Sequence, residues 1–531
     1  MGIRTAVEGA LSAAREGGAE GTGRRSRHWL GVGALTALAA AGYAVFALLL
    51  YYTFQTSSYD LVIFDQAVRS YAHFQPGISI IKGVHNGFGP HFSVLGDHWS
   101  PILAALAPLY WIYNGPQVLL VAQAVLFALA IPPIWVFTRR AFGGGSKATA
   151  AAYLIAVAYA LSWPIASALD FDFHEVAFAP LLIAVALERL QAGKLRSALI
   201  ALAILLLVKE DMGLLVAGIG LYLAVARPRT VTRQRLVGGI LIAAGVADSV
   251  IATYVLIPAF GGRSNYYWAY TSLGHNLPQA AWHLLTHPAA ADLLVTPRVK
   301  LYTMLWLFGA FCFLPLRSPI ALATIPLLLE RMLANLFPDW WVTSYQYNAY
   351  LVVILVCAAV DGAARFDRAW QARRPGSAEG PARGTGAVGL GCAAAMCAVA
   401  VVLVPHFAFG AALRPSLYHR NAQENAAAAA DAVVPAGVTV QAVDNLGPQL
   451  SARDTVLLWD GDGKTPPLGS SWVVANVRQR QFTFRSLREQ KRRLALLERK
   501  GYHVVFSRDG YIVLHRGGSQ PGAADSEEVK G

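Results

Sequence analysis

Acidic and histidine side chains gather in a polar segment that follows the first long apolar run. This segment carries Asp60, Asp65, Asp97, His91 and His98, and hardly any Lys or Arg. A carboxylate can act as a general base, and an imidazole can exchange a proton near neutral pH. These residue types predict an active site in this segment. The alternative is an ordinary external loop, where polar residues collect without any chemical role.

A second polar segment, "ASALDFDFHE", contains Asp170, Asp172 and His174. In an extended chain, residues at i, i+2 and i+4 point to the same side. Carboxylates in such an arrangement suit hard cations such as Mg²⁺ or Mn²⁺. A divalent cation is therefore one option for this segment, although the spacing matches no fixed metal-binding signature.

Two later segments add further candidates for binding a charged substrate. Ionisable groups near membrane depth are costly, and they usually face a cavity or one another. Tyr side chains, by contrast, also form the aromatic belts found at membrane interfaces in many proteins. The candidates are Lys209, Glu210 and Asp211 in "KED", and Arg331, Tyr345 and Tyr347 in "ERMLANLFPDWWVTSYQYNAY".

The composition places these segments in a membrane protein. Of the 531 residues, 55% are hydrophobic and 14% are charged, and the mean hydropathy is +0.44. Soluble domains carry about 25% charged residues. The formal net charge is +13, and the Lys and Arg residues collect between apolar runs. This pattern indicates orientation in the membrane and contact with anionic lipids, and it argues against nucleic acid as a partner.

The apolar runs predict a mainly α-helical, polytopic membrane protein with about eleven spans and a small external α/β domain at the C-terminal end. The composition changes from about residue 427 to short β-branched runs, and an amphipathic pattern predicts a helix over about 486–500 in this domain. The basic cluster "GRRSRH" precedes the first span, so we expect a cytoplasmic N-terminus and an extracellular C-terminal domain in the plasma membrane. The least regular pair of spans is the hairpin at 196–226. We expect a basic tail (1–28), a membrane domain (29–407), an α/β domain (408–515) and a disordered tail (516–531), with external loops at 53–115, 165–176, 259–300 and 331–346.

Five motifs in this order resemble those of a bacterial family of predicted membrane proteins that is catalogued only as a domain of unknown function. They are "YDLVIFDQAVRS", "GDHWSPILAALAPLYW", "FDFHEVAFAP", "KEDMGL" and "YQYNAYLVVIL". The resemblance extends over nearly the whole chain. That family is in turn similar to the GT-C superfamily of integral-membrane glycosyltransferases.

The second resemblance implies transfer of a sugar from a polyprenyl-phosphate carrier to a glycan, lipid or protein acceptor outside the cell. An acid of the first external loop would activate the acceptor, and Asp65 is the first choice over Asp60 because it lies in the apolar run "LVIFDQAV". Lys209, His91, His98 or Arg331 would stabilise the leaving phosphate. A fold does not fix a function, so a noncatalytic cell-envelope scaffold or sensor and a secondary transporter remain as alternatives.

Overall fold

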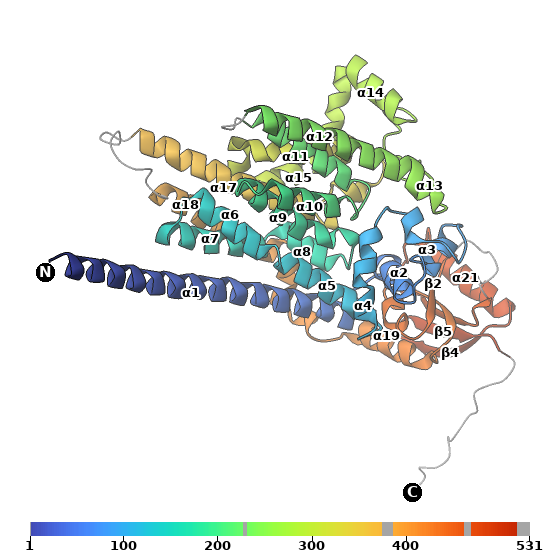
Figure 1. Ribbon diagram of the computed structural model, residues 1–531. Helices are drawn as coiled ribbons and strands as arrows, with labels where there is room; N and C mark the ends of the chain where they lie inside the picture. The colour runs from blue at the N-terminus through green and yellow to red at the C-terminus, as the bar shows by residue number, and fades with distance from the viewer. Residues whose placement is uncertain (1, 227–230, 374–385, 461–468, 518–531) are drawn as a thin grey trace, which may run out of the picture.

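Long apolar runs fold into helices because a helix satisfies its backbone hydrogen bonds within one segment, as the bilayer core requires. The computed structural model describes residues 2–226, 231–373, 386–460 and 469–517, and it is mainly helical (Figure 1). The bundle consists of α1 (Gly2–Tyr52), α5 (Gln117–Ala128), α6 (Ile131–Ala141), α7 (Gly145–Ala160), α8 (Trp163–Asp170), α9 (Ala179–Gln191), α10 (Leu195–Leu205), α11 (Met212–Val225), α12 (Val231–Ile251), α15 (Val299–Gly309), α16 (Ile325–Leu333), α17 (Ala349–Ala372) and α18 (Ala387–Leu403).

Six helical stretches within the described residues are long and apolar enough to cross a membrane. The expected count of eleven spans is not confirmed, because α9, α10, α11, α15 and α16 have only 9 to 14 residues each. A straight crossing needs about 20 residues. The six stretches are Arg27–Tyr52, Gln117–Ala141, Gly145–Asp170, Gln234–Ala259, Gln346–Ala372 and Ala387–His406.

Helix α17 forms the centre of the bundle, since every residue from Ala349 to Val360 is buried. Helices α11 and α12 pack closely because glycines face each other across their contact. A Cβ atom at Gly238 would lie 2.7 Å from the carbonyl oxygen of Gly220, which no side chain tolerates. Small residues at such positions let membrane helices approach one another. This contact places α12 beside the cavity described below.

Short helices cover one end of the bundle (Figure 1). Between α1 and α5 the chain forms a π-helical turn (Ser58–Val62), α2 (Ile63–Ala72), α3 (Ile80–His85) and α4 (Ala107–Tyr110). Between α12 and α15 it forms α13 (Ile257–Ala259) and α14 (Leu277–Thr286). These two regions carry much of the lining of the cavity.

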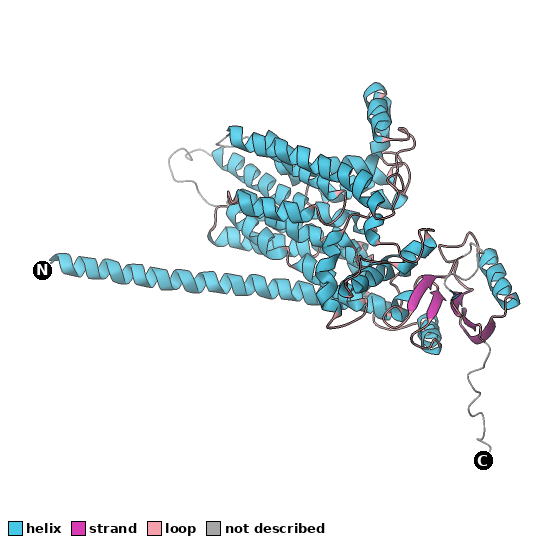
Figure 2. Ribbon diagram, turned by 45° about the vertical axis from the view of Figure 1, so that its right-hand side comes forward, coloured by secondary structure: helices cyan, strands magenta, loops and turns pink. Residues whose placement is uncertain are grey.

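The C-terminal domain contains the expected small sheet, which lies at the same end of the molecule (Figure 2). The strand order is β2-β1-β3-β5-β4; β1 pairs in parallel with β2 and β3, and the remaining pairs are antiparallel. The helix expected over 486–500 is α21, and the disordered tail expected at 516–531 lies almost entirely outside the described residues. The elements are α19 (Ala422–Val433), β1 (Thr439–Ala442), α20 (Gly447–Leu450), β2 (Thr455–Leu458), β3 (Trp472–Asn476), α21 (Leu487–Arg499), β4 (His503–Arg508) and β5 (Tyr511–His515).

Hydrogen bonds between distant parts of the chain join this domain to the end of α1 and to α2. The Gln449 amide donates to the Tyr51 carbonyl oxygen at 2.7 Å, and the Gln66 amide donates to the Val456 carbonyl oxygen at 3.0 Å. Arg420 donates to the Tyr52 carbonyl oxygen at 2.7 Å. The segment between α1 and α5 is therefore enclosed between the bundle and the C-terminal sheet.

Candidate active site

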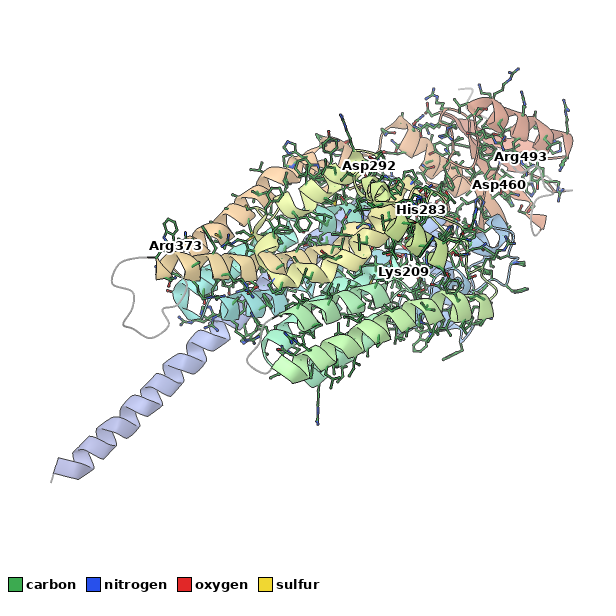
Figure 3. All side chains as sticks on the ribbon, turned by 90° about the horizontal axis from the view of Figure 1, so that it is seen from above. Lys209, His283, Asp292, Arg373, Asp460 and Arg493 are labelled. Atoms are coloured by element: carbon green, nitrogen blue, oxygen red, sulfur yellow. The ribbon has the colours of Figure 1, made fainter. Side chains whose placement is uncertain are left out.

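A cavity of about 970 Å³ is lined by residues of the short helices and of the segments that connect them. Its walls come from five stretches that are distant in sequence, and these include all four polar segments singled out above. Lys209 lies in the half of the bundle nearer the C-terminal domain, whereas Arg373 lies at the opposite end (Figure 3). The expected site residues that line the cavity are Asp60, Asp97, His98, His174, Lys209, Glu210, Asp211, Arg331, Tyr345 and Tyr347.

Asp60 lies in the π-helical turn between α1 and α2, and it is a half-buried acid that lines the cavity. Its side chain is 25% exposed, and Oδ1 lies 3.4 Å from Nε2 of His174. The Ser57 hydroxyl lies 3.3 Å from Oδ2. π-Helical turns are rare and occur often at functional sites, because they re-aim a side chain. Asp60 thus has a fixed geometry together with access to the cavity.

His174 is held so that Nε2 faces Asp60. Its ring stacks on Phe171 with centroids 5.2 Å apart and meets the edge of Phe64 at 5.5 Å. Its backbone N–H donates to Oε1 of Gln123 at 3.2 Å. These contacts fix the imidazole beside the carboxylate, where the pair can share a proton.

A buried lysine forms a second charged group in the wall. The ammonium group of Lys82 lies 2.9 Å from Oδ2 of Asp97, and Tyr267 donates to Oδ1 of that carboxylate at 2.7 Å. Burial alone would lower the pKa of Lys82, but the Asp97 carboxylate outweighs burial and raises it. Burial would likewise raise the pKa of Asp97, and Lys82 reverses this and lowers it. Both groups are therefore charged at neutral pH.

His98 and Glu210 form a third group. Nδ1 of His98 lies 2.7 Å from Oε1 of Glu210, and the Trp99 backbone N–H donates to Oε2 at 3.1 Å. The His98 ring stacks on Tyr267 with centroids 4.8 Å apart. Burial acts to lower the pKa of His98, but the Glu210 carboxylate prevails and raises it. The ring is therefore biased toward the imidazolium form, a positive charge beside the cavity.

The cationic side chains that line the cavity differ in whether they already pair with other groups of the protein. Lys209 lies 3.1 Å from Oε1 of Glu175. The Arg331 guanidinium donates to the carbonyl oxygens of Trp340 and Tyr347 and to the Asn348 side chain, which makes it a structural clamp. Arg263 lines the cavity and is exposed.

Among the described residues Arg263 has no carboxylate partner, and its guanidinium lies 5.6 Å from the ring centroid of Phe88. A substrate anion could pair with this charge without breaking an existing ion pair. Arg263 is therefore the best-placed cation in the lining to hold a phosphate.

Part of the cavity lining is apolar. Val246, Val250 and Tyr254 follow one face of α12 and the π-helical turn after it, and all three are exposed as well as lining. Leu277 and Leu284 of α14 extend this apolar part of the lining. The cavity lining therefore combines charged residues with apolar residues, and several of the apolar residues are also exposed on the outer surface of the bundle.

Asp65, the first choice from the sequence, does not line the cavity. It is 0% exposed, it pairs with Arg69 at 2.7 Å, and it accepts a hydrogen bond from the Tyr110 hydroxyl at 2.9 Å. Burial raises its pKa, although Arg69 and Tyr110 lower it in part. The apolar run around Asp65 is the inner face of α2, so the acid is sealed in the core and cannot reach an acceptor.

Four other residues that the sequence predicted for the site do not contact one another. His91 and Asp170 are exposed and do not line the cavity. Asp172 accepts from the Ser57 backbone N–H at 2.7 Å. His174 faces Asp60 instead. In the part of the chain that the structure describes, no group of three or more His, Cys, Asp or Glu side chains is arranged to hold a metal ion.

Lys82 and Arg263 were missed by the analysis of the sequence. Lys82 had one signal, since it is one of only two basic residues in 53–115. Arg263 had a weaker one, the "GGR" that precedes an aromatic run. Gly262 packs against the carbonyl oxygen of Gly96 more closely than any side chain would allow. This contact brings the 263–270 segment over the segment between α1 and α5, and a single sequence does not reveal it.

Comparison with known proteins gives a family match, and several chains of solved structures also match. Residues 50–513 match the model of a family described as "Predicted membrane protein (DUF2079)". A search of curated proteins found no match. Among solved structures, ArnT from Cupriavidus metallidurans, bound to undecaprenyl phosphate, matches with a TM-score of 0.49 and 15% identity. This match covers 92% of this chain and 99% of that chain.

Proposed function

The chain belongs to the DUF2079 family of predicted membrane proteins, and we propose that it is a membrane glycosyltransferase that uses a polyprenyl-phosphate-linked sugar. The acceptor would be a component of the cell envelope on the extracytoplasmic face. The similarity of this family to the GT-C superfamily supports this class of reaction, and the chemistry of the cavity supports the class of donor.

The observation that carries the proposal is the combination of charged and apolar lining residues in one cavity. A polyprenyl-phosphate sugar has an anionic phosphate, a polar sugar and a long hydrocarbon chain. Arg263 and Lys82 offer positive charge for the phosphate, and the exposed apolar residues of α12 and α14 offer a surface for the chain. Ligand sites combine apolar walls with a few placed polar groups in this way.

In the proposed reaction Asp60 acts as general base. It takes the proton from the acceptor hydroxyl as that oxygen forms a bond to the anomeric carbon of the sugar. The bond from the anomeric carbon to the phosphate oxygen breaks, and its electron pair leaves with the polyprenyl phosphate. Arg263 and Lys82 stabilise the charge that develops on this oxygen. His174 beside Asp60 can then accept the proton and return the carboxylate to its basic form.

The positions of the basic residues support a cytoplasmic N-terminus. Arg373 lies at the end of the bundle that faces away from the C-terminal domain, the end toward which the N-terminus of α1 extends (Figure 3). Cytoplasmic loops carry the excess of Lys and Arg in membrane proteins. This arrangement would put the C-terminal domain and the cavity on the extracytoplasmic side.

Binding of the carrier tests the proposal without knowledge of the sugar. The purified protein in lipid nanodiscs would be titrated with polyprenyl phosphate, with polyprenol and with phosphatidylglycerol, and binding would be followed by native mass spectrometry. We expect polyprenyl phosphate to bind at least tenfold more tightly than either control. We expect Arg263→Gln to weaken that binding about tenfold, the loss of one charge-assisted pair.

The matched control is Arg196→Gln, since Arg196 is exposed at the start of α10 and does not line the cavity. Equal binding of the three lipids would overturn the proposal and favour a scaffold. Ion-coupled movement of a solute across sealed vesicles, with no preference for polyprenyl phosphate, would favour a transporter.

A further inference from the structure

The turn that carries Asp60 is held by residues that lie far away in the sequence. The first backbone N–H groups of a helix have no partner within it. Here the Ser57 N–H donates to Oδ2 of Asp172 at 2.7 Å, the Ser58 N–H to the Asp444 carbonyl oxygen at 2.8 Å, and the Tyr59 N–H to Oδ1 of Asp444 at 3.0 Å. Asp444 therefore satisfies two successive N–H groups directly before Asp60.

Asp444 is itself fixed by the C-terminal sheet. It lies in the loop after β1, and the preceding Val443 donates its N–H to the Val474 carbonyl oxygen of β3 at 3.0 Å. The Asn445 side chain donates to the Tyr511 hydroxyl of β5 at 2.8 Å and lies 3.4 Å from the Phe54 carbonyl oxygen. The loop thus connects the sheet rigidly to the end of α1.

Close packing reinforces this connection. A Cβ atom at Gly447 would collide with the Ser58 hydroxyl oxygen, so only glycine lets α20 approach the turn. That hydroxyl also donates to the Asp444 carbonyl oxygen at 2.6 Å. Three hydrogen bonds and one packing contact therefore link residues 444–447 to residues 58–59, and none of the four involves the helix bundle.

We propose that Asp444 is a positioning residue that holds the Asp60 turn in its reactive geometry, so that the C-terminal domain is a working part of the active site. This inference rests on the proposed function, because it takes Asp60 as the base. Sugar transfer would then depend on docking of the C-terminal domain onto the Asp60 turn, because an undocked sheet would release the N–H groups of Ser58 and Tyr59.

Charge adds a second effect of the same residue. Burial raises the pKa of Asp444 to about 7, the hydrogen bond from Tyr59 lowers it, the nearby Asp60 carboxylate raises it, and His85 of α3 lowers it. Asp172, from the segment after α8, is the third carboxylate of this group. Ionised Asp444 places a second negative charge beside the Asp60 carboxylate. Since the neutral form of Asp444 is favoured below about pH 7, this charge is present above that pH and is lost below it.

Two substitutions separate the hydrogen bond from the charge. Asp444→Asn keeps an oxygen that can accept from the Tyr59 N–H, but it removes the charge. Asp444→Ala removes both. The matched control is Asp454→Asn, because Asp454 is a buried acid of the same domain whose carboxylate accepts from the Val438 N–H, away from the turn.

The experiment uses the full-length protein in nanodiscs and measures turnover against pH together with hydrogen exchange of the amides at 58–61. For Asp444→Ala we expect kcat to fall about tenfold with KM within twofold, and the Tyr59 amide to exchange at least tenfold faster. For Asp444→Asn we expect kcat within about threefold and loss of the step near pH 7 from the pH profile. Asp454→Asn should leave the amide exchange and the pH profile unchanged.

Two results would overturn the inference. One is an unchanged exchange rate of the Tyr59 amide in Asp444→Ala. The other is a pH profile that Asp444→Asn leaves as in the wild type. Amide exchange needs no turnover, so absence of transfer in the wild type would refute the proposed function, while the exchange rates would still decide whether Asp444 holds the turn.

Discussion

Asp60 and Asp65 lie five residues apart on consecutive turns of helix, yet their surroundings are opposite. Asp60 is 25% exposed, lines the cavity and faces an imidazole at 3.4 Å. Asp65 is 0% exposed and is closed off by Arg69 and Tyr110. One acid keeps a lone pair available to a substrate, and the other has its oxygens engaged in holding α2 against the segment that ends in Tyr110.

The difference shows what an acid in an apolar run means in a membrane protein. An apolar sequence around a carboxylate indicates burial, and a buried carboxylate survives when it has partners of its own. Arg69, four residues after Asp65 on the same helix, is such a partner and is visible in the sequence. The sequence therefore contained the information that Asp65 is structural. The following tests address this contrast directly.

The largest effect is expected from removal of the charge on Asp60. Asp60→Asn should lower kcat by about 10²- to 10⁴-fold, the usual contribution of a general base. The folded structure should be retained, because the side chain is half-buried and its neighbour Ser57 can still donate to the amide oxygen. Single-turnover kinetics and a thermal melt of the same preparation would measure both. A variant with wild-type turnover would remove Asp60 from the mechanism.

Asp65→Ala should act on stability instead of catalysis. It leaves the Arg69 guanidinium and the Tyr110 hydroxyl without their shared partner, which we expect to cost about 3 kcal/mol. The pair Asp361–Arg365 has the same spacing and the same distance of 2.7 Å but is more exposed, with Asp361 22% and Arg365 48% exposed, so Asp361→Ala is the matched control and should cost less than about 1 kcal/mol. Chemical denaturation in detergent would compare them. Equal costs would show that burial does not distinguish the two pairs.

The smallest expected effect concerns pH. Burial raises the pKa of Asp65 above its ordinary value near 3.8, so the folded protein binds this proton more tightly than the unfolded chain. The resulting stabilisation is complete below about pH 3.8 and is lost as pH rises through the folded pKa. The Tm of the wild type minus that of Asp65→Asn should therefore be greater at pH 4.5 than at pH 8. A difference that is independent of pH would contradict the burial of an ionisable Asp65.

Much of the fold follows from local properties of the sequence. The apolar runs predicted the six long spans, the change in composition after about residue 427 indicated the small sheet, and the amphipathic pattern at 486–500 indicated α21. The number of spans did not follow, because short apolar runs such as the one that forms α16 fold into short helices whose length is set by packing.

The sequence predicted which segments form the candidate site, but it did not predict the role of each residue in that site. The polar segments around Asp60, Asp97 and Lys209 do line one cavity. Which acid faces inward depends on the π-helical turn and on Asp444, and the contact with Asp444 joins residues separated by 385 positions. A contact of that range depends on how the C-terminal sheet docks, which no local pattern in one sequence encodes.

The central claim is that Asp60 is the base and Asp65 is not, and rescue by formate tests it most directly. Asp60→Ala and Asp65→Ala would be assayed side by side with a polyprenyl-phosphate-linked sugar, per folded molecule, with and without formate. We predict that Asp60→Ala loses transfer and that formate raises its rate of transfer at least tenfold. Folded Asp65→Ala should transfer at the wild-type rate and should not respond to formate. Full transfer by Asp60→Ala, together with loss and formate rescue in Asp65→Ala, would contradict the account.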